Sequence, residues 1–199
     1  MNNSRVIHLA SLAGVIGPIL FTLVLTGLTI AQADFMRTLG WNPTGPVIDW
    51  PSGLALGPYG WVMTVTFFIC GVLMALFAYG LKVALKDNLA TTLLMIAGFA
   101  MMGLIFTTDP TLTTVRKSWH GILHDSFFAL LGLTLMPGML LLGRVFQKNE
   151  HWKNLAPYTW ITLAFIIPTF WLKGVFFYVF LLSILTWSVV IALRLRALQ

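Results

Sequence analysis

Residues 59–84 read YGWVMTVTFFICGVLMALFAYGLKVA, a stretch in which Lys82 is the only charged side chain. An α-helix needs about 20 apolar residues to cross a hydrocarbon core of about 30 Å, so this stretch is predicted to span a membrane. The whole chain has the same character. Of its 199 residues 58% are hydrophobic and 9% are charged, whereas soluble domains are roughly half apolar and about a quarter charged. The sequence therefore predicts a multi-pass membrane protein.

Five further apolar runs accompany the first, at about residues 8–30, 88–107, 119–146, 155–172 and 175–193. They predict an all-α fold, a bundle of about six transmembrane helices that forms a single domain over residues 1–199. Residues 34–58 are interrupted by glycine and proline and are too broken for a spanning helix. We expect this segment to lie along the outer membrane surface.

The first apolar run has two interpretations. Ala31-Gln32-Ala33 has the small residues of a signal-peptide cleavage site, but the preceding run is longer than the 7–15 apolar residues of a signal peptide. We therefore expect a retained helix. Cleavage after Ala33 stays an open alternative.

The basic residues predict the orientation of the bundle, because cytoplasmic flanks of membrane helices are enriched in Lys and Arg. With both termini in the cytoplasm, eight of the twelve basic residues lie inside and four outside. The inner ones are Arg5, Lys82, Lys86, Arg144, Lys148, Lys153, Arg194 and Arg196, and the outer ones Arg37, Arg116, Lys117 and Lys173. The formal charge of +6 is thus assigned to topology, and nucleic acid is not expected as a partner. The partners expected are membrane lipids.

This orientation places Asp49, Asp109, His120, His124 and Asp125 at the outer end of the bundle. Residues four apart share a helix face, so both imidazoles could bind one metal ion, with a carboxylate oxygen of Asp109 as third ligand. Three protein ligands and one open position are typical of catalytic zinc, which activates water. Asp49 or Asp125 would then act as base or orient a ligand. The pattern suggests a metal-dependent hydrolase of a lipid amide or ester.

Structural roles explain the same residues equally well. Asp109 before Pro110 is a common way to end a helix and form a turn. An ion pair of Asp109 or Asp125 with Arg116 or Lys117 would hold the acidic residues without any substrate. The residue after His120 is Gly121, not the glutamate of the zinc metalloprotease motif. Haem is not expected, because His8 is predicted at the opposite end of the bundle from His120 and His124.

Four motifs can be compared with known families: DWPS at 49–52, GPYGW at 57–61, FTTDP at 106–110 and HGILH at 120–124. Together they resemble a bacterial and archaeal membrane family called domain of unknown function 998. The resemblance covers nearly the whole chain and implies a bundle of about six spans in a prokaryotic inner membrane. The family tends to carry Gln or Glu followed by Arg near the start of its last helix, where this chain has Phe176-Phe177-Tyr178. More distantly, acids and histidines at one membrane face look like those of intramembrane zinc hydrolases of the alkaline ceramidase type.

Two other classes of function remain open beside a hydrolase. A non-enzymatic protein could bind or move an amphiphilic small molecule in the same outer pocket. A structural subunit of a membrane complex would need only small-residue contact faces, such as Gly71 with Ala75 and Gly98 with Gly103.

Overall fold

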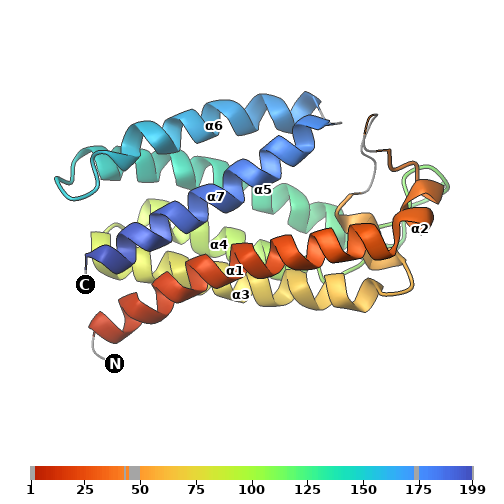
Figure 1. The fold of residues 1–199 in the computed structure, drawn as a ribbon, viewed down its shortest axis with the longest axis horizontal. Coiled ribbons are helices and arrows are strands. Elements are labelled where there is room, and N and C mark those ends of the chain that lie inside the picture. Colours follow the sequence, from red (N-terminus) through yellow and green to blue (C-terminus); the bar gives the residue numbers. More distant parts are fainter. Residues whose placement is uncertain (1–2, 43, 45–49, 173–174, 199) are drawn as a thin grey trace.

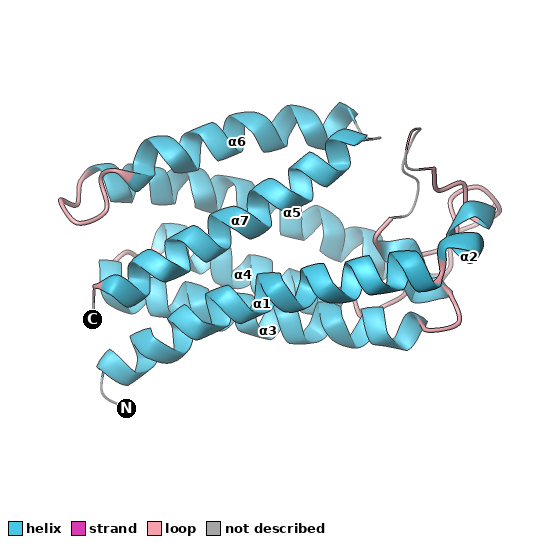
Figure 2. Ribbon diagram, viewed as in Figure 1, coloured by secondary structure: helices cyan, strands magenta, loops and turns pink. Residues whose placement is uncertain are grey.

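The computed structural model describes residues 3–42, 44, 50–172 and 175–198, and within them every regular element is a helix, as expected. The elements in chain order are α1 (Asn3–Ala31), α2 (Ala33–Thr38), the 3-10 helix η1 (Ser52–Leu56), α3 (Gly60–Leu85), α4 (Leu89–Gly103), α5 (Trp119–Gln147), α6 (Leu155–Leu172) and α7 (Val175–Ala197). The loops gather at the two ends of the bundle (Figure 2).

The six long helices form a ring. Each packs against the next along the chain, from α1 to α3, α4, α5, α6 and α7, and α7 returns to pack against α1. Figure 1 shows these helices running side by side along the long axis, with both termini at one end and α2 at the other. Loss of residues 1–33 by cleavage after Ala33 would therefore remove the helix that closes the ring.

The helices suit a lipid environment by length and composition. Among the described residues α1, α3, α5 and residues 176–197 of α7 are long and apolar enough to cross a membrane, and α4 and α6 contain shorter apolar helices. Large apolar side chains such as Leu9, Leu23, Ile30 and Leu182 are exposed. Such an exterior is costly in water but natural in hydrocarbon.

Small residues bring α3 and α4 into close contact. A Cβ added to Gly98 would lie 2.7 Å from the backbone nitrogen of Ala75 and 2.8 Å from the carbonyl oxygen of Gly71. The expected contact face of Gly71 and Ala75 is thus present, and Gly98 is its counterpart on α4. Gly103 faces a different element, because its added Cβ would meet the ring of Phe127 on α5.

Three helix boundaries differ from the expected ones by four residues or more. α1 begins at Asn3 and α7 ends at Ala197, so both extend beyond the predicted apolar runs. α4 ends at Gly103, four residues before the predicted position 107. There the backbone changes to tighter bonds between residues three apart, from the N–H groups of Leu104, Ile105 and Phe106 to the carbonyls of Met101, Met102 and Gly103. Asp109-Pro110 comes after this 3-10 turn, so it does not itself end the helix.

The segment around η1 is tied to the end of α1 by one buried side chain. Gln32 donates from Nε2 to the carbonyl of Leu54 in η1 at 3.1 Å, and its Oε1 accepts from the backbone N–H of Tyr59 at 3.1 Å. Trp50 donates from its indole nitrogen to the hydroxyl of Thr29 at 3.0 Å. These bonds fix η1, and with it Ser52, over the end of the helical ring opposite the two termini.

Candidate functional site

The two histidines of α5 bind backbone carbonyls of the segment that follows α4. Nδ1 of His120 lies 2.9 Å from the carbonyl oxygen of Thr107, and Nδ1 of His124 lies 2.7 Å from that of Phe106. A carbonyl oxygen can only accept, so each Nδ1 carries the proton and donates it. The early end of α4 is what frees these carbonyls, because a continuing helix would use them for its own hydrogen bonds.

Asp109 organises the beginning of α5. Its Oδ2 accepts from the backbone N–H of Ser118 at 2.7 Å, and its Oδ1 accepts from the Ser118 hydroxyl at 2.8 Å. The same hydroxyl accepts from the backbone N–H of Gly121 at 3.0 Å, which makes Ser118 the N-cap of α5. The bonds from Ser118, with smaller contributions from His120 and Lys117, hold the pKa of Asp109 below its ordinary value.

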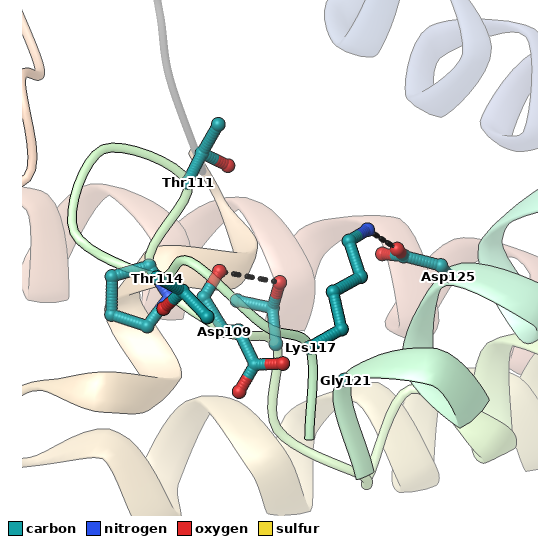
Figure 3. A pocket seen from close by; sticks show the side chains of 8 residues that line it. Asp109, Thr111, Thr114, Lys117, Gly121 and Asp125 are labelled. Atoms are coloured by element: carbon teal, nitrogen blue, oxygen red, sulfur yellow. Dashed lines mark hydrogen bonds and ion pairs between the residues drawn. The ribbon is translucent and has the colours of Figure 1, made fainter. Parts of the chain in front are cut away.

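A small polar pocket lies beside this carboxylate. It has a volume of about 170 Å³ and is lined by Thr108, Asp109, Pro110, Thr111, Thr114, Lys117, Gly121 and Asp125. Figure 3 shows the ammonium group of Lys117 directed at the carboxylate of Asp125, with which it forms an ion pair. One of the ion pairs suggested by the sequence is therefore present, and it gives Asp125 a structural partner.

His124 also reaches a residue far away in the sequence. Its Nε2 lies 3.0 Å from Oγ of Ser52, the first residue of η1, and its side chain is 3% exposed. When the ring is uncharged and Nδ1 donates to Phe106, Nε2 has a lone pair that accepts from the serine hydroxyl. His124 is among the site residues predicted from the sequence and Ser52 is not, although Ser52 belongs to the DWPS motif at 49–52.

An apolar cavity of about 590 Å³ occupies the centre of the ring, and Ser52 lines it. Its walls come from α1, α3, α4, α5 and α7, including Phe21, Phe67, Leu131, Gly132, Phe177 and Leu181. Ligand cavities in proteins typically measure about 300–1,000 Å³ and are mostly apolar with a few polar groups. The cavity thus has the size and lining of a binding site, with the Ser52 hydroxyl as one of its polar groups.

The chain matches one known protein family over most of its length. The sequence model of one family, described as protein of unknown function (DUF998), matches residues 24–194. The chain belongs to the DUF998 family. No curated protein and no solved structure matches it. The family suggested by the motifs is therefore confirmed, and the functional argument for this DUF998 chain depends on its own residues.

The structure brings together some of the predicted site residues of the DUF998 chain. His120 and Asp109 approach each other, with 4.0 Å between Nδ1 and Oδ1, whereas His124 turns toward Ser52. Asp49 lies outside the described residues. The described residues hold no group of three His, Cys, Asp or Glu side chains placed for one metal ion. The zinc site on His120, His124 and Asp109 stays a prediction, and it would require a metal to replace a hydrogen bond that His124 now makes.

Proposed function

We propose that this DUF998 chain is a six-span protein of a prokaryotic inner membrane, in which α1, α3, α4, α5, α6 and α7 cross the bilayer. Both termini lie in the cytoplasm. The excess of basic residues at the end that holds the termini supports this orientation, and so does the apolar exterior of the ring. The Ser52–His124 pair then lies near the outer membrane surface.

Cysteine labelling in intact cells tests this topology. Cys70 is the single cysteine, so a C70A background accepts one new thiol at a time. Ser126, near the start of α5, and Lys148, just after its end, are both exposed. A membrane-impermeant maleimide should label S126C in intact cells and K148C only after lysis. Labelling of K148C alone in intact cells would reverse the orientation.

We further propose that the protein binds an amphiphilic small molecule, with its hydrocarbon chain in the central cavity. The cavity supports this most directly, because about 590 Å³ of apolar space inside a membrane protein is stabilised by a hydrocarbon chain that fills it. The Ser52 hydroxyl, and His124 behind it, lie where the chain would meet its polar head. A single-chain lipid fits this division into one long apolar part and one small polar part.

The wall of α5 offers a route from the bilayer to the cavity. Phe128, Ala129 and Leu133 line the cavity and are all exposed, with Leu133 at 72%. Side chains in a closely packed wall would be buried. These three are exposed, so the wall of the cavity is open at this part of α5. A lipid chain entering from the membrane would therefore pass the outer half of α5.

A cavity-filling variant tests the binding function. Gly132 lines the cavity and a Cβ there would meet no atom within 4 Å, so G132F would place a ring in this open space. Gly27 on α1 has equally free surroundings and does not line the cavity, which makes G27F the matched control. The probe is stearate with a nitroxide on its chain, added to protein in lipid nanodiscs. Its motionally restricted spectral component should be present in wild type and G27F and be lost in G132F. Equal spectra for all three proteins would refute binding in the cavity.

A further inference from the structure

We infer that Ser52 is a nucleophile activated by His124, and that the protein cleaves an ester of a single acyl chain held in the cavity. This inference rests on the proposed binding of an amphiphile. It assigns the reaction to a serine and a histidine without a metal ion, which differs from the zinc mechanism expected from the sequence.

The geometry is that of a serine and its general base. A base must lie about 2.6–3.2 Å from the atom whose proton it takes, and Nε2 of His124 lies 3.0 Å from Oγ of Ser52. The base must also be held by a third group, and the Phe106 carbonyl does this at 2.7 Å from Nδ1. That bond fixes the tautomer in which Nε2 can accept the proton of the serine.

The position of the pair relative to the cavity completes the argument. Ser52 lines the cavity and His124 does not, while the Ser52 hydroxyl contacts the imidazole, so the serine lies between His124 and the space for the substrate chain. His124 itself is buried behind it. A serine held only to join η1 to α5 would not need to border the apolar cavity. This placement suits a reacting carbonyl at the outer end of a chain that lies in the cavity.

The reaction is a two-step acyl transfer. Oγ of Ser52 attacks the ester carbonyl carbon while its proton passes to Nε2 of His124. The bond between the acyl carbon and the alcohol oxygen breaks, and the alcohol leaves with the proton from Nε2, so an acyl-serine remains. Water then attacks the acyl carbon, giving its proton to Nε2. The bond to Oγ breaks, Ser52 regains its proton, and a free fatty acid is released.

A fluorophosphonate bearing an alkyl chain tests the nucleophile, because it reacts with an activated serine and adds a mass that intact-protein and peptide mass spectrometry detect. The wild type should be labelled at Ser52 and S52A should not. Ser188 lines the same cavity but donates its hydroxyl to the Gly14 carbonyl, so S188A is the matched control and should be labelled like the wild type.

The role of His124 needs a variant that keeps its structural bond. In H124N the side-chain amide can still donate to the Phe106 carbonyl, as Nδ1 does, but the imidazole nitrogen Nε2 that lies beside Ser52 is lost. Labelling should slow by about 100-fold or more, the usual contribution of a general base. The apparent midpoint of thermal unfolding checks that H124N is folded. If H124N does not fold, the comparison of S52A with S188A still decides which serine is the nucleophile.

The outcomes separate this inference from the binding function. If the nitroxide stearate is bound in the cavity but the wild type takes no label, binding stands and the Ser52 nucleophile is wrong. Label that persists in S52A, or that reaches folded H124N at the wild-type rate, also overturns it. If neither binding nor labelling occurs, the proposed function itself fails. Binding together with label at Ser52 that depends on His124 supports both.

Discussion

Gly121 lies so close to Asp109 that a Cβ added to it would be 2.0 Å from Oδ2 of the carboxylate. The two residues belong to different motifs of the sequence, FTTDP at 106–110 and HGILH at 120–124. Their contact explains why a glycine stands in the first turn of α5, between two histidines. The absent side chain leaves room for the carboxylate that binds Ser118, the N-cap of the same helix.

G121A should therefore destabilise the end of the bundle at which α5 begins. The added methyl group must displace a carboxylate that Ser118 holds with two hydrogen bonds, and overpacking of this kind costs about 1–3 kcal/mol. The measurement is the apparent midpoint of thermal unfolding in detergent. Gly132 lies on the same helix with no atom within 4 Å of an added Cβ, so G132A is the control and should be at least as stable as the wild type, because alanine favours the helix. An equally stable G121A would show that the contact is not tight.

Acid should weaken the same contact. Hydrogen bonds from Ser118 lower the pKa of Asp109 in the folded state, so the unfolded state binds the proton more readily. The contribution of Asp109 to stability is full above its unfolded pKa of about 3.9 and is lost as pH falls through the lowered folded value. Thermal unfolding of the wild type below about pH 4 should show this loss. In D109N it should be smaller, because the amide binds no proton in this range.

The fold class was predictable from the sequence because membrane helices follow from local composition. Each apolar run was found within a few residues, since burial in hydrocarbon needs only length and apolarity. The end of α4 was not found. The residues just after Gly103 are as apolar as the helix itself, so composition does not mark its end. Beyond that end two histidines of α5 bind the carbonyls of Phe106 and Thr107, and this tertiary contact has no local sequence signal.

Part of the candidate site was also predictable from the sequence. His120, His124 and Asp109 could be assigned to one end of the bundle, because topology places the ends of neighbouring helices together. Ser52 could not be assigned to His124, since 72 residues separate them and no periodic pattern relates η1 to α5. The bonds of Gln32 to Leu54 and Tyr59, which set the position of η1, are equally non-local.

The contact between α3 and α4 gives a prediction about the bundle itself. In G98A the new methyl group would meet backbone atoms of Gly71 and Ala75, which cannot move aside as a flexible side chain can. The two helices must separate, so we expect a loss of about 1–3 kcal/mol. G27A on α1 is the control, because its methyl group meets no atom within 4 Å and alanine favours the helix. The measurement is the apparent midpoint of thermal unfolding of the two variants. Equal midpoints for G98A and G27A would contradict the close packing of α3 and α4.

Zinc content distinguishes the serine mechanism from the metal site that the sequence suggested. His124 uses Nδ1 for the Phe106 carbonyl and Nε2 for Ser52, so a metal on this ring must replace one of these bonds. We expect detergent-purified protein to hold far less than one zinc per chain by elemental mass spectrometry, and added zinc to leave thermal unfolding unchanged. The control is the double variant H120A/H124A, with its folding checked in the same way. Stoichiometric zinc in the wild type, lost in the folded double variant, would instead establish the metal site and a zinc-activated water as the nucleophile. In that case zinc on Nε2 would also separate Ser52 from its base, and fluorophosphonate labelling should rise when the metal is removed with a chelator.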